Sequence, residues 1–319
     1  MKKVVAIKRD VSTLYIYWVL TNACNYNCRY CPEHLKTGQI NNSTYPTNEN
    51  INHFIDEVID KYLQGRFLSV LLSGGEPTLH PMFKTIVERM APLGYVEVTT
   101  NGSQSIRWWQ EMEVLPSKIV ISLHPEFTNL DEINKLGIFL LKKNVKLNFN
   151  LMCDPKNWDW LDNIKTKLDE SLQVLVNAKI LVEHTEKVAY GKMFEYQSNQ
   201  LHYIKINQSN IATKDARNKV NIIYNDGTHD TVLTDITNIT LSGTDSKPVF
   251  TGWSCSAGKD GYMVTHNGIV KAGICGAGNL GKLDDFKPFD SNVTCVKNVC
   301  NFPKDLGLNK HDPTLLQDQ

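Results

Sequence analysis

The chain has 319 residues, of which 41% are hydrophobic and 21% are charged, and its 34 basic and 34 acidic residues give a formal net charge of zero. This composition is ordinary for a globular protein, and the balanced charge gives no support to a polyanion-binding surface. No apolar run is long enough to span a membrane, and residues 1–10 lack the hydrophobic stretch of a secretory signal. We therefore expect a cytoplasmic protein whose eight cysteines serve metal binding or catalysis rather than disulfides.

Strand and helix patterns alternate through the first half of the chain. Apolar residues recur at helical spacing over 51–62, 82–90 and 158–168, and Pro155 suits the first turn of the last of these helices. Strands are predicted over 14–20, 67–73, 95–100, 118–123, 145–152 and 174–182. This alternation predicts βα units around a parallel sheet, and therefore an α/β fold.

Three cysteines follow the first predicted strand within eight residues, as Cys24, Cys28 and Cys31. Three thiolates at this spacing suit three irons of a four-iron cluster and leave the fourth iron without a protein ligand. An open coordination position is where a metal centre does chemistry, whereas closed centres are structural. Zinc is the alternative, and it is disfavoured because no second cysteine or histidine pair lies nearby.

A glycine pair ends the second predicted strand, in the run Gly74-Gly75-Glu76-Pro77. Adjacent glycines after a strand let the backbone approach a ligand closely, and Glu76 adds a carboxylate that can accept from an ammonium group. Together with the cysteine triad, this run resembles the radical S-adenosylmethionine (SAM) superfamily over residues 12–183. In that family the triad holds a [4Fe-4S] cluster with an open iron, and the glycine motif holds the methionyl amine of SAM.

The resemblance implies a partial (β/α)6 barrel over residues 1–200 and SAM contacts at several further positions. Tyr30 resembles the aromatic residue that contacts the adenine. Asn101, in the run Thr-Asn-Gly, and Ser122 resemble polar residues of the third and fourth strands near the ribose, carboxylate or substrate. The glycine-rich pattern that many members have on the fifth strand is missing, and Asn148 and Asn150 occupy its place.

One face of several predicted strands is polar, although strands of a parallel sheet are normally apolar on both faces. Because side chains alternate along a strand, these polar rows are expected to point into the barrel lumen and bind SAM and a polar substrate. Exposure to water at a sheet edge is the alternative, above all for the last two residues. The rows comprise Glu97, Thr99 and Asn101; Ser122 and His124; Asn148 and Asn150; Asn177 and Lys179.

A second group of cysteines lies in the last quarter of the chain. Asn267-Gly268 predicts a hairpin between the first two of them, and 220–233 reads as another hairpin. The group resembles the Twitch and SPASM domains, which carry auxiliary clusters. This resemblance implies a small hairpin-containing domain over 201–319, with a second [4Fe-4S] cluster as the expected group and structural zinc as the alternative. The ligands would be Cys255, Cys275, Cys295 and Cys300.

Cys153 stands apart from both groups, at the end of the fifth predicted strand. A thiol at the carboxyl end of a barrel strand could give a hydrogen atom to a substrate radical, as in some epimerases of the family. Strand parity places it on the apolar face, where a free cysteine packs as a small hydrophobic residue, and this packing role is favoured.

The resemblance implies an enzyme that cleaves SAM reductively to a 5′-deoxyadenosyl radical, with electrons from a donor such as flavodoxin or ferredoxin. A small polar substrate is expected, namely a sugar, cyclitol, amino acid or nucleotide, because only a dozen residues precede the first strand and leave no room for a peptide-binding domain. The outcome would be oxidation, epimerisation or rearrangement. Alternatives are a peptide maturase with a separate partner protein, a nucleic-acid base modifier, and a non-catalytic iron–sulfur protein for electron transfer or sensing.

Overall fold

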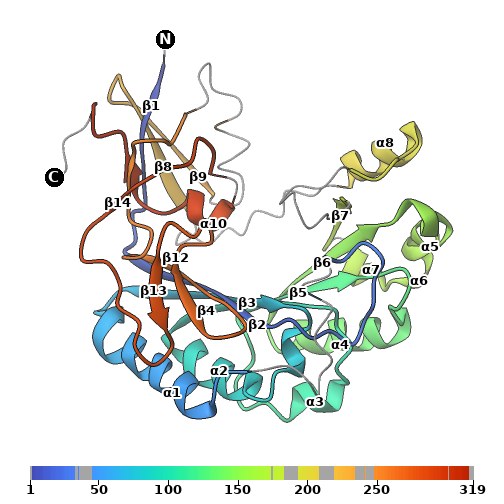
Figure 1. The fold of residues 1–319 in the computed structure, drawn as a ribbon. Coiled ribbons are helices and arrows are strands. Elements are labelled where there is room, and N and C mark those ends of the chain that lie inside the picture. The colour runs from blue at the N-terminus through green and yellow to red at the C-terminus, as the bar shows by residue number, and fades with distance from the viewer. Residues whose placement is uncertain are drawn as a thin grey trace. The chain divides into compact units, whose positions relative to one another are not determined.

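The computed structural model describes residues 2–32, 35, 45–173, 175–182, 193–207, 219–233, 241, 248–300 and 302–315 (Figure 1). The chain divides into two compact units. The barrel unit comprises Val19–Tyr45 and Leu71–Ile211, and the terminal unit comprises Met1–Trp18, Pro46–Val70 and Ala212–Gln319. The sequence analysis expected a barrel domain over 1–200 and an auxiliary domain over 201–319. The structure instead groups both ends of the chain in the terminal unit. No helix among the described residues is long and apolar enough to cross a membrane.

Parallel strands form the sheet of the barrel unit, as the alternating pattern predicts, and the unit contains β4 to β7 with the carboxyl-terminal parts of β2 and β3. The strand order is β2-β3-β4-β5-β6-β7, and β4 to β7 pair in parallel. Each predicted strand is present within two residues of its expected ends. Their bounds are Thr13–Thr21 (β2), Phe67–Gly74 (β3), Gly94–Thr100 (β4), Lys118–Leu123 (β5), Lys146–Cys153 (β6) and Val176–Ile180 (β7). The α/β fold with a parallel sheet is therefore confirmed.

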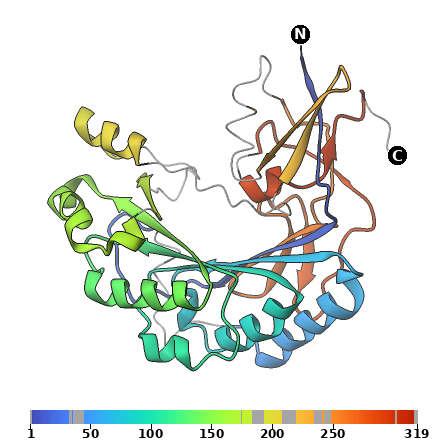
Figure 2. The same cartoon turned by 180° about the vertical axis from the view of Figure 1, so that it is seen from behind.

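Helices cover one face of these strands, as Figures 1 and 2 show for α2, α3 and α4. Asn129 caps α4 by accepting from the backbone N–H groups of Asp131 and Glu132. The helix predicted over 158–168 is split into α5 and α6, with Asn163 between them, and Pro155 lies in a separate 3-10 turn. The helices of the unit are Phe83–Met90 (α2), Ile106–Gln110 (α3), Leu130–Lys142 (α4), Trp158–Asp162 (α5), Ile164–Lys167 (α6), Glu170–Gln173 (α7) and Ser198–Ile206 (α8). The 3-10 turns are Pro77–Leu79, Ala91–Leu93 and Pro155–Asn157.

The two faces of the central strands differ as side-chain alternation requires. A Cβ on Gly137 of α4 would lie 3.4 Å from Leu147 of β6, and one on Gly102 would lie within 3 Å of both Ile121 of β5 and Ile133 of α4. The apolar rows of β5 and β6 therefore pack against α4, and their side chains are fully buried. The polar rows occupy the opposite face, where most of their members are half-buried.

The terminal unit contains an antiparallel sheet whose strand order is β14-β10-β15-β1-β8-β9. Strand β1, which is not among the strands predicted above, pairs with both β8 and β15. Val4, Ile7, Val220, Ile222 and Trp253 belong to the core of this unit. The strand bounds are Val4–Lys8 (β1), Lys219–Tyr224 (β8), His229–Leu233 (β9), Ser254–Cys255 (β10), Val293–Thr294 (β14) and Lys310–His311 (β15).

Both predicted hairpins are present in the terminal unit. β8 pairs with β9, and β11 (Gly261–Val264) pairs with β12 (Ile269–Ala272) around Gly268, whose φ of 80° favours glycine. β12 also pairs with β13 (Asn279–Lys282), and β11 runs parallel to the first half of β2. The helix predicted over 51–62 consists of α1 (Asn48–Glu57), capped by Thr47, and a π-helical turn at Val58–Leu63, and a short helix α10 covers Pro303–Leu306.

Candidate functional site

The three cysteines of the first group lie in one loop that leaves the carboxyl end of β2. The backbone N–H of Tyr26 donates to Cys24 Sγ over 3.3 Å, and the N–H of Cys31 donates to the Cys28 carbonyl. All three are free thiols. The pKa of Cys28 is raised to about 12, chiefly by burial and to a smaller extent by the neighbouring Cys31, Glu126 and Cys24. The loop thus gathers three thiols that need a metal to become thiolates at neutral pH.

The glycine pair lets the end of β3 lie directly against the beginning of the cysteine loop. The N–H of Gly75 donates to Thr21 O over 2.7 Å, and that of Glu76 donates to Ala23 O over 2.8 Å. A Cβ on Gly74 would lie 2.3 Å from Thr21 O, and one on Gly75 would lie 2.2 Å from Ala23 O. Both residues must be glycine for this backbone contact to form.

Glu76 is fully buried, and its carboxylate accepts four hydrogen bonds. Oε1 accepts from the hydroxyls of Thr78 (2.6 Å) and Thr100 (2.7 Å) and from the Thr78 N–H, whereas Oε2 accepts from the Asn101 N–H over 2.6 Å. Burial raises the pKa of Glu76, and the hydrogen bonds to Asn101, Thr78 and Thr100 oppose the rise. The carboxylate therefore joins the ends of β3 and β4, and in this structure protein donors occupy both of its oxygens.

Asn101 connects this carboxylate to the cysteine loop. Its side-chain amide donates to Asn25 Oδ1 over 2.9 Å and lies 3.8 Å from Cys24 Sγ, while its Oδ1 accepts from the Ser103 N–H. The third-strand asparagine expected near the ribose or substrate thus lies beside a candidate cluster ligand.

Tyr30 and His124 form a second contact with the triad. His124 Nδ1 lies 2.9 Å from the Tyr30 hydroxyl and 3.3 Å from Cys28 Sγ, and the two rings stack at 6°. Burial lowers the pKa of His124 to about 4, which keeps its imidazole neutral. His124 was expected from the polar row of β5, and the structure brings it to Cys28.

The remaining polar-row residues lie in register across the sheet. Ser122 pairs with Asn150, and Asn150 pairs with Asn177 on β7. Thr99 and Asn148 both pair with Val120 on the same face. These residues are half-buried. They form a polar floor on the face that α4 leaves uncovered.

An ion pair that the sequence patterns did not reveal anchors the cysteine loop. Both Nε and Nη2 of Arg29 donate to the carboxylate of Asp154, which is fully buried at the end of β6. Asp154 also accepts from the side chain of Asn157 and the N–H of Lys156, and the guanidinium carbon of Arg29 lies 5.0 Å from the centroid of the Phe194 ring. An acidic residue directly after the carboxyl end of a strand is the signal that could have indicated Asp154.

Cys153 is fully buried, and its thiol donates to the Leu151 carbonyl over 3.4 Å. Burial raises its pKa to about 12. This placement describes a packed side chain, which is the alternative favoured from strand parity.

The four cysteines of the second group gather within the terminal unit, and all are free thiols. Cys255 lies in β10, Cys275 follows β12, and Cys295 and Cys300 follow β14. Burial is the main cause of the raised pKa values of Cys255, Cys275 and Cys300, and Cys255 adds to the rise at the other two. Four thiols are the donor set of a tetracysteinyl cluster and also of a structural zinc ion.

In the part of the chain that the structure describes, no three His, Cys, Asp or Glu side chains converge on a single-ion site. A cubane cluster spreads its ligands over four irons, so its thiolates need not meet at one point.

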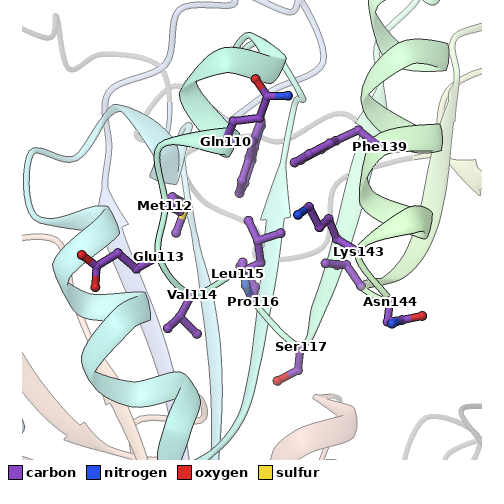
Figure 3. A pocket seen from close by; sticks show the side chains of 12 residues that line it. Gln110, Met112, Glu113, Val114, Leu115, Pro116, Ser117, Phe139, Lys143 and Asn144 are labelled. Carbon is purple, nitrogen blue, oxygen red and sulfur yellow. The ribbon is translucent and has the colours of Figure 1, made fainter.

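A cavity of about 570 Å³ in the barrel unit lies away from all of these residues (Figure 3). Its lining includes residues 112–117, directly before β5, and Lys143 to Val145, directly before β6. It therefore lies at the amino ends of these strands, whereas His124 and Cys153 lie at their carboxyl ends. None of the predicted site residues lines it.

Comparison with known proteins supports the family assignment. Residues 18–142 match the model of the Radical SAM superfamily. A probable GTP 3′,8-cyclase of Sulfurisphaera tokodaii is 31% identical over 193 residues, which are 56% of this chain and 58% of that protein. The GTP 3′,8-cyclase of Haemophilus ducreyi is 26% identical over 208 residues, or 58% of this chain and 56% of that protein. The chain thus spans little more than half the length of these curated relatives.

The fold also resembles that of a solved structure, native anSMEcpe with bound AdoMet. The two align with a TM-score of 0.51 and 16% identity, over 86% of this chain and 79% of the other. This likeness concerns the fold alone. The matched segment 18–142 contains the cysteine triad, Gly74-Gly75-Glu76, Asn101 and His124, which the structure assembles at one end of the sheet, and over this segment the chain is similar to the Radical SAM superfamily.

Proposed function

We propose that this protein cleaves SAM reductively and removes a hydrogen atom from a small polar substrate. The observation that carries the proposal is the assembly of Cys24, Cys28 and Cys31 beside Asn101 and His124, at the carboxyl ends of the barrel strands. When bound there, a [4Fe-4S] cluster and SAM would supply a 5′-deoxyadenosyl radical. The protein's part is to hold, orient and shield these groups.

The three thiols would hold the cluster, and the surrounding side chains would fix the loop that carries them. Arg29 ties the loop to the end of β6 through Asp154, and Asn101 ties it to the end of β4. The buried Glu76 positions Asn101 through the backbone N–H. Because Glu76 already accepts four hydrogen bonds, we propose that it supports the SAM site by positioning the ends of β3 and β4, and that the Gly74-Gly75 backbone lies closest to the methionyl group.

The polar floor would receive the rest of SAM and the substrate. Tyr30 and Ser122 are the proposed contacts of the adenosyl group, and Thr99, Asn148 and Asn150 offer hydroxyl and amide groups for polar atoms. Amides and hydroxyls both donate and accept, which suits a hydroxylated or heterocyclic molecule. A nucleotide is the favoured member of this class, because the curated relatives named above are GTP 3′,8-cyclases.

The four cysteines of the terminal unit are proposed to hold a second [4Fe-4S] cluster. Cys255 raises the pKa of Cys275 and of Cys300, and it is paired directly with β14, the strand that precedes Cys295. Four thiolates would saturate a cubane. Zinc is the competing occupant, and metal analysis separates the two.

The proposal is tested with anaerobically reconstituted protein, SAM, a strong reductant and GTP. We expect 5′-deoxyadenosine, and we expect Cys28→Ala to abolish it. A bond between the 3′ and 8 positions requires loss of the ribose 3′ hydrogen, so GTP deuterated at C3′ should transfer deuterium to 5′-deoxyadenosine. If 5′-deoxyadenosine forms without deuterium, the enzyme class stands and GTP is rejected as the substrate. Sugars, cyclitols and amino acids are then tested in the same way.

Cys153 is tested in the same assay. Because its thiol is buried and bonded to Leu151 O, we expect Cys153→Ala to retain product formation and to lose about 1 kcal/mol of stability through the small cavity. Loss of product with 5′-deoxyadenosine still formed would make Cys153 the hydrogen donor after all.

A further inference from the structure

We propose that Lys310 is a positioning residue of the four-cysteine centre in the terminal unit, where its buried ammonium group binds Cys300 and makes the reduction potential of the centre less negative. This inference rests on the proposed second cluster. It concerns a residue that no cysteine motif indicates, because Lys310 lies ten positions after the last cysteine.

The fold places Lys310 directly beside the cysteines. It lies in β15, and its register partner on β10 is Cys255. Its side chain extends along the site: Nζ donates to Cys300 Sγ over 3.5 Å and to the Asp305 carbonyl over 2.7 Å. The ring of Phe250 lies 5.3 Å from the same nitrogen. Lys310 is thus paired through its backbone strand with Cys255 and bonded through its side chain to Cys300.

This lysine is 4% exposed, so its ammonium group is removed from water. Burial of a charged amine costs several kcal/mol unless an opposite charge and hydrogen bonds compensate it. If the four thiols were neutral, the charge that compensates the buried ammonium group would have to come from other residues. Four metal-bound thiolates would place negative charge at the sulfur that Nζ already contacts.

The carboxylate of Asp305 accepts from two backbone N–H groups. Asp305 Oδ1 accepts from the Ile274 N–H over 2.9 Å, and Oδ2 accepts from the Cys275 N–H over 2.6 Å. Lys310 is bonded to the backbone carbonyl of Asp305 instead. The carboxylate thus holds the Cys275 loop, while the ammonium group holds Cys300, and the two together frame the centre from α10 and β15.

Hydrogen bonds to the sulfurs and the net charge around a cluster both set its potential. A buried ammonium bonded to a ligand sulfur stabilises the reduced, more negative form more than the oxidised form. The centre should therefore accept an electron more readily with Lys310 than without it.

The chain offers a matched control in Lys297. This lysine lies two residues after Cys295 and is exposed, and its Nζ donates to the Cys275 carbonyl over 2.7 Å. Its contact with a sulfur is through the backbone, where its carbonyl accepts from Cys295 Sγ over 3.6 Å, so a change of side chain leaves that contact in place. Removal of either lysine changes the net charge equally. Water and salt screen the exposed charge, so its effect on the centre should be small.

The experiment uses the full chain with Cys24, Cys28 and Cys31 replaced by alanine, so that only the second centre binds iron. Its midpoint potential is measured by an EPR-monitored redox titration. We expect Lys310→Met to shift the potential in the negative direction at unchanged iron content, Lys310→Arg to shift it less, and Lys297→Met to leave it near the parent value. Equal potentials in the Lys310→Met protein and the parent would overturn the proposal.

A second measurement keeps the proposal falsifiable if Lys310→Met does not fold. The parent chain is labelled with ¹⁵N-lysine, and the reduced centre is examined by pulsed EPR for a hyperfine coupling to the label. A coupling is expected, and its absence would contradict the hydrogen bond to Cys300. Zinc in place of iron at this centre would also overturn the proposal. Neither measurement needs SAM, so failure of the parent enzyme to form 5′-deoxyadenosine is a separate result.

Discussion

At the residue scale, Glu76 shows how one buried side chain organises the candidate site. The Gly-Gly-Glu motif identified the residue in the sequence, but its partners depend on how the ends of β3 and β4 come together. Thr78, Thr100 and Asn101 are separated from Glu76 by two to 25 positions, and no local pattern links them. The sequence therefore predicted the residue and not its contacts.

Replacement of Glu76 by Gln tests this organising role. The amide keeps the size of the side chain but turns one acceptor into a donor that faces either the Asn101 N–H or the three donors at Oε1. An unsatisfied buried polar contact costs about 1–3 kcal/mol. We expect chemical denaturation to show that loss in the free energy of unfolding, and we expect the cysteine triad to retain its iron. The formation of 5′-deoxyadenosine should fall at least about tenfold, which corresponds to a rise of 1.4 kcal/mol in the activation barrier. Thr100→Val removes one of the four donors to Glu76 together with the acceptor of the Gly102 N–H, and it should reduce 5′-deoxyadenosine formation less than Glu76→Gln does. Unchanged activity of Glu76→Gln would contradict the role.

The contact between Gly75 and Ala23 makes a steric prediction. A Cβ at Gly75 would meet backbone atoms at 2.2 and 2.7 Å, so Gly75→Ala must displace the cysteine loop. Gly65 has nothing within 4 Å, and its φ of 74° makes alanine costly only through the backbone, by about 1 kcal/mol. Urea unfolding should show a larger loss for Gly75→Ala than for Gly65→Ala. Equal losses would mean that the close approach does not constrain the loop.

At the element scale, hydrophobic periodicity gave the barrel strands and most helices, because each buries one continuous apolar row. Periodicity does not predict β1, because four of its five residues are buried and the strand lacks an alternating pattern. Nothing in Val4–Ile7 indicates which strands it pairs with. Those partners, β8 and β15, lie more than 200 positions away. The break between α5 and α6 was also missed, because the apolar stripe continues across Asn163 and masks it.

The turn that links β3 to α2 contains a buried histidine, from which we expect the free energy of unfolding to fall in acid. His80 is 4% exposed, its Nδ1 accepts from the Met82 N–H over 3.1 Å, and burial lowers its pKa from 6.5 to about 4. Between these values the unfolded chain binds more protons than the folded chain. The stabilisation is therefore complete above pH 6.5 and is lost as the pH falls towards 4.

His80→Asn removes this titration and keeps a side-chain acceptor for Met82. We expect the difference in unfolding free energy between the parent and the variant to change by up to about 3 kcal/mol from pH 6.5 to pH 4, with the parent losing more. Urea unfolding across this range provides the measurement. Parallel pH profiles for the two proteins would show that the neutral imidazole of His80 does not contribute.

At the scale of the whole molecule, the N-terminal strand belongs to the unit that contains the second cysteine group. Ile7 is fully buried, and its register partners are Ile222 on β8 and Lys310 on β15. The second centre should therefore depend on the beginning of the chain as well as on its end.

Ile7→Asp tests this dependence, because an unpaired carboxylate in that core destabilises the sheet that carries Cys255 and Lys310. Val11→Asp is the control, since Val11 is 36% exposed. Two cubanes correspond to about eight irons per chain. We expect Ile7→Asp to retain about four irons, held by the first triad, and Val11→Asp to retain about eight. Full iron content in the Ile7→Asp protein would show that iron binding at the second centre does not depend on the N-terminal strand.

The most direct test of the central claim is an anaerobic assay of 5′-deoxyadenosine from SAM, with iron counted in the same sample. With a strong reductant and a panel of small polar substrates headed by GTP, we expect 5′-deoxyadenosine from protein that carries about eight irons per chain. The Cys28→Ala protein, examined in parallel, should form none. A fully loaded parent protein that forms no 5′-deoxyadenosine with any of these substrates would contradict the account and favour an electron-transfer or sensing role.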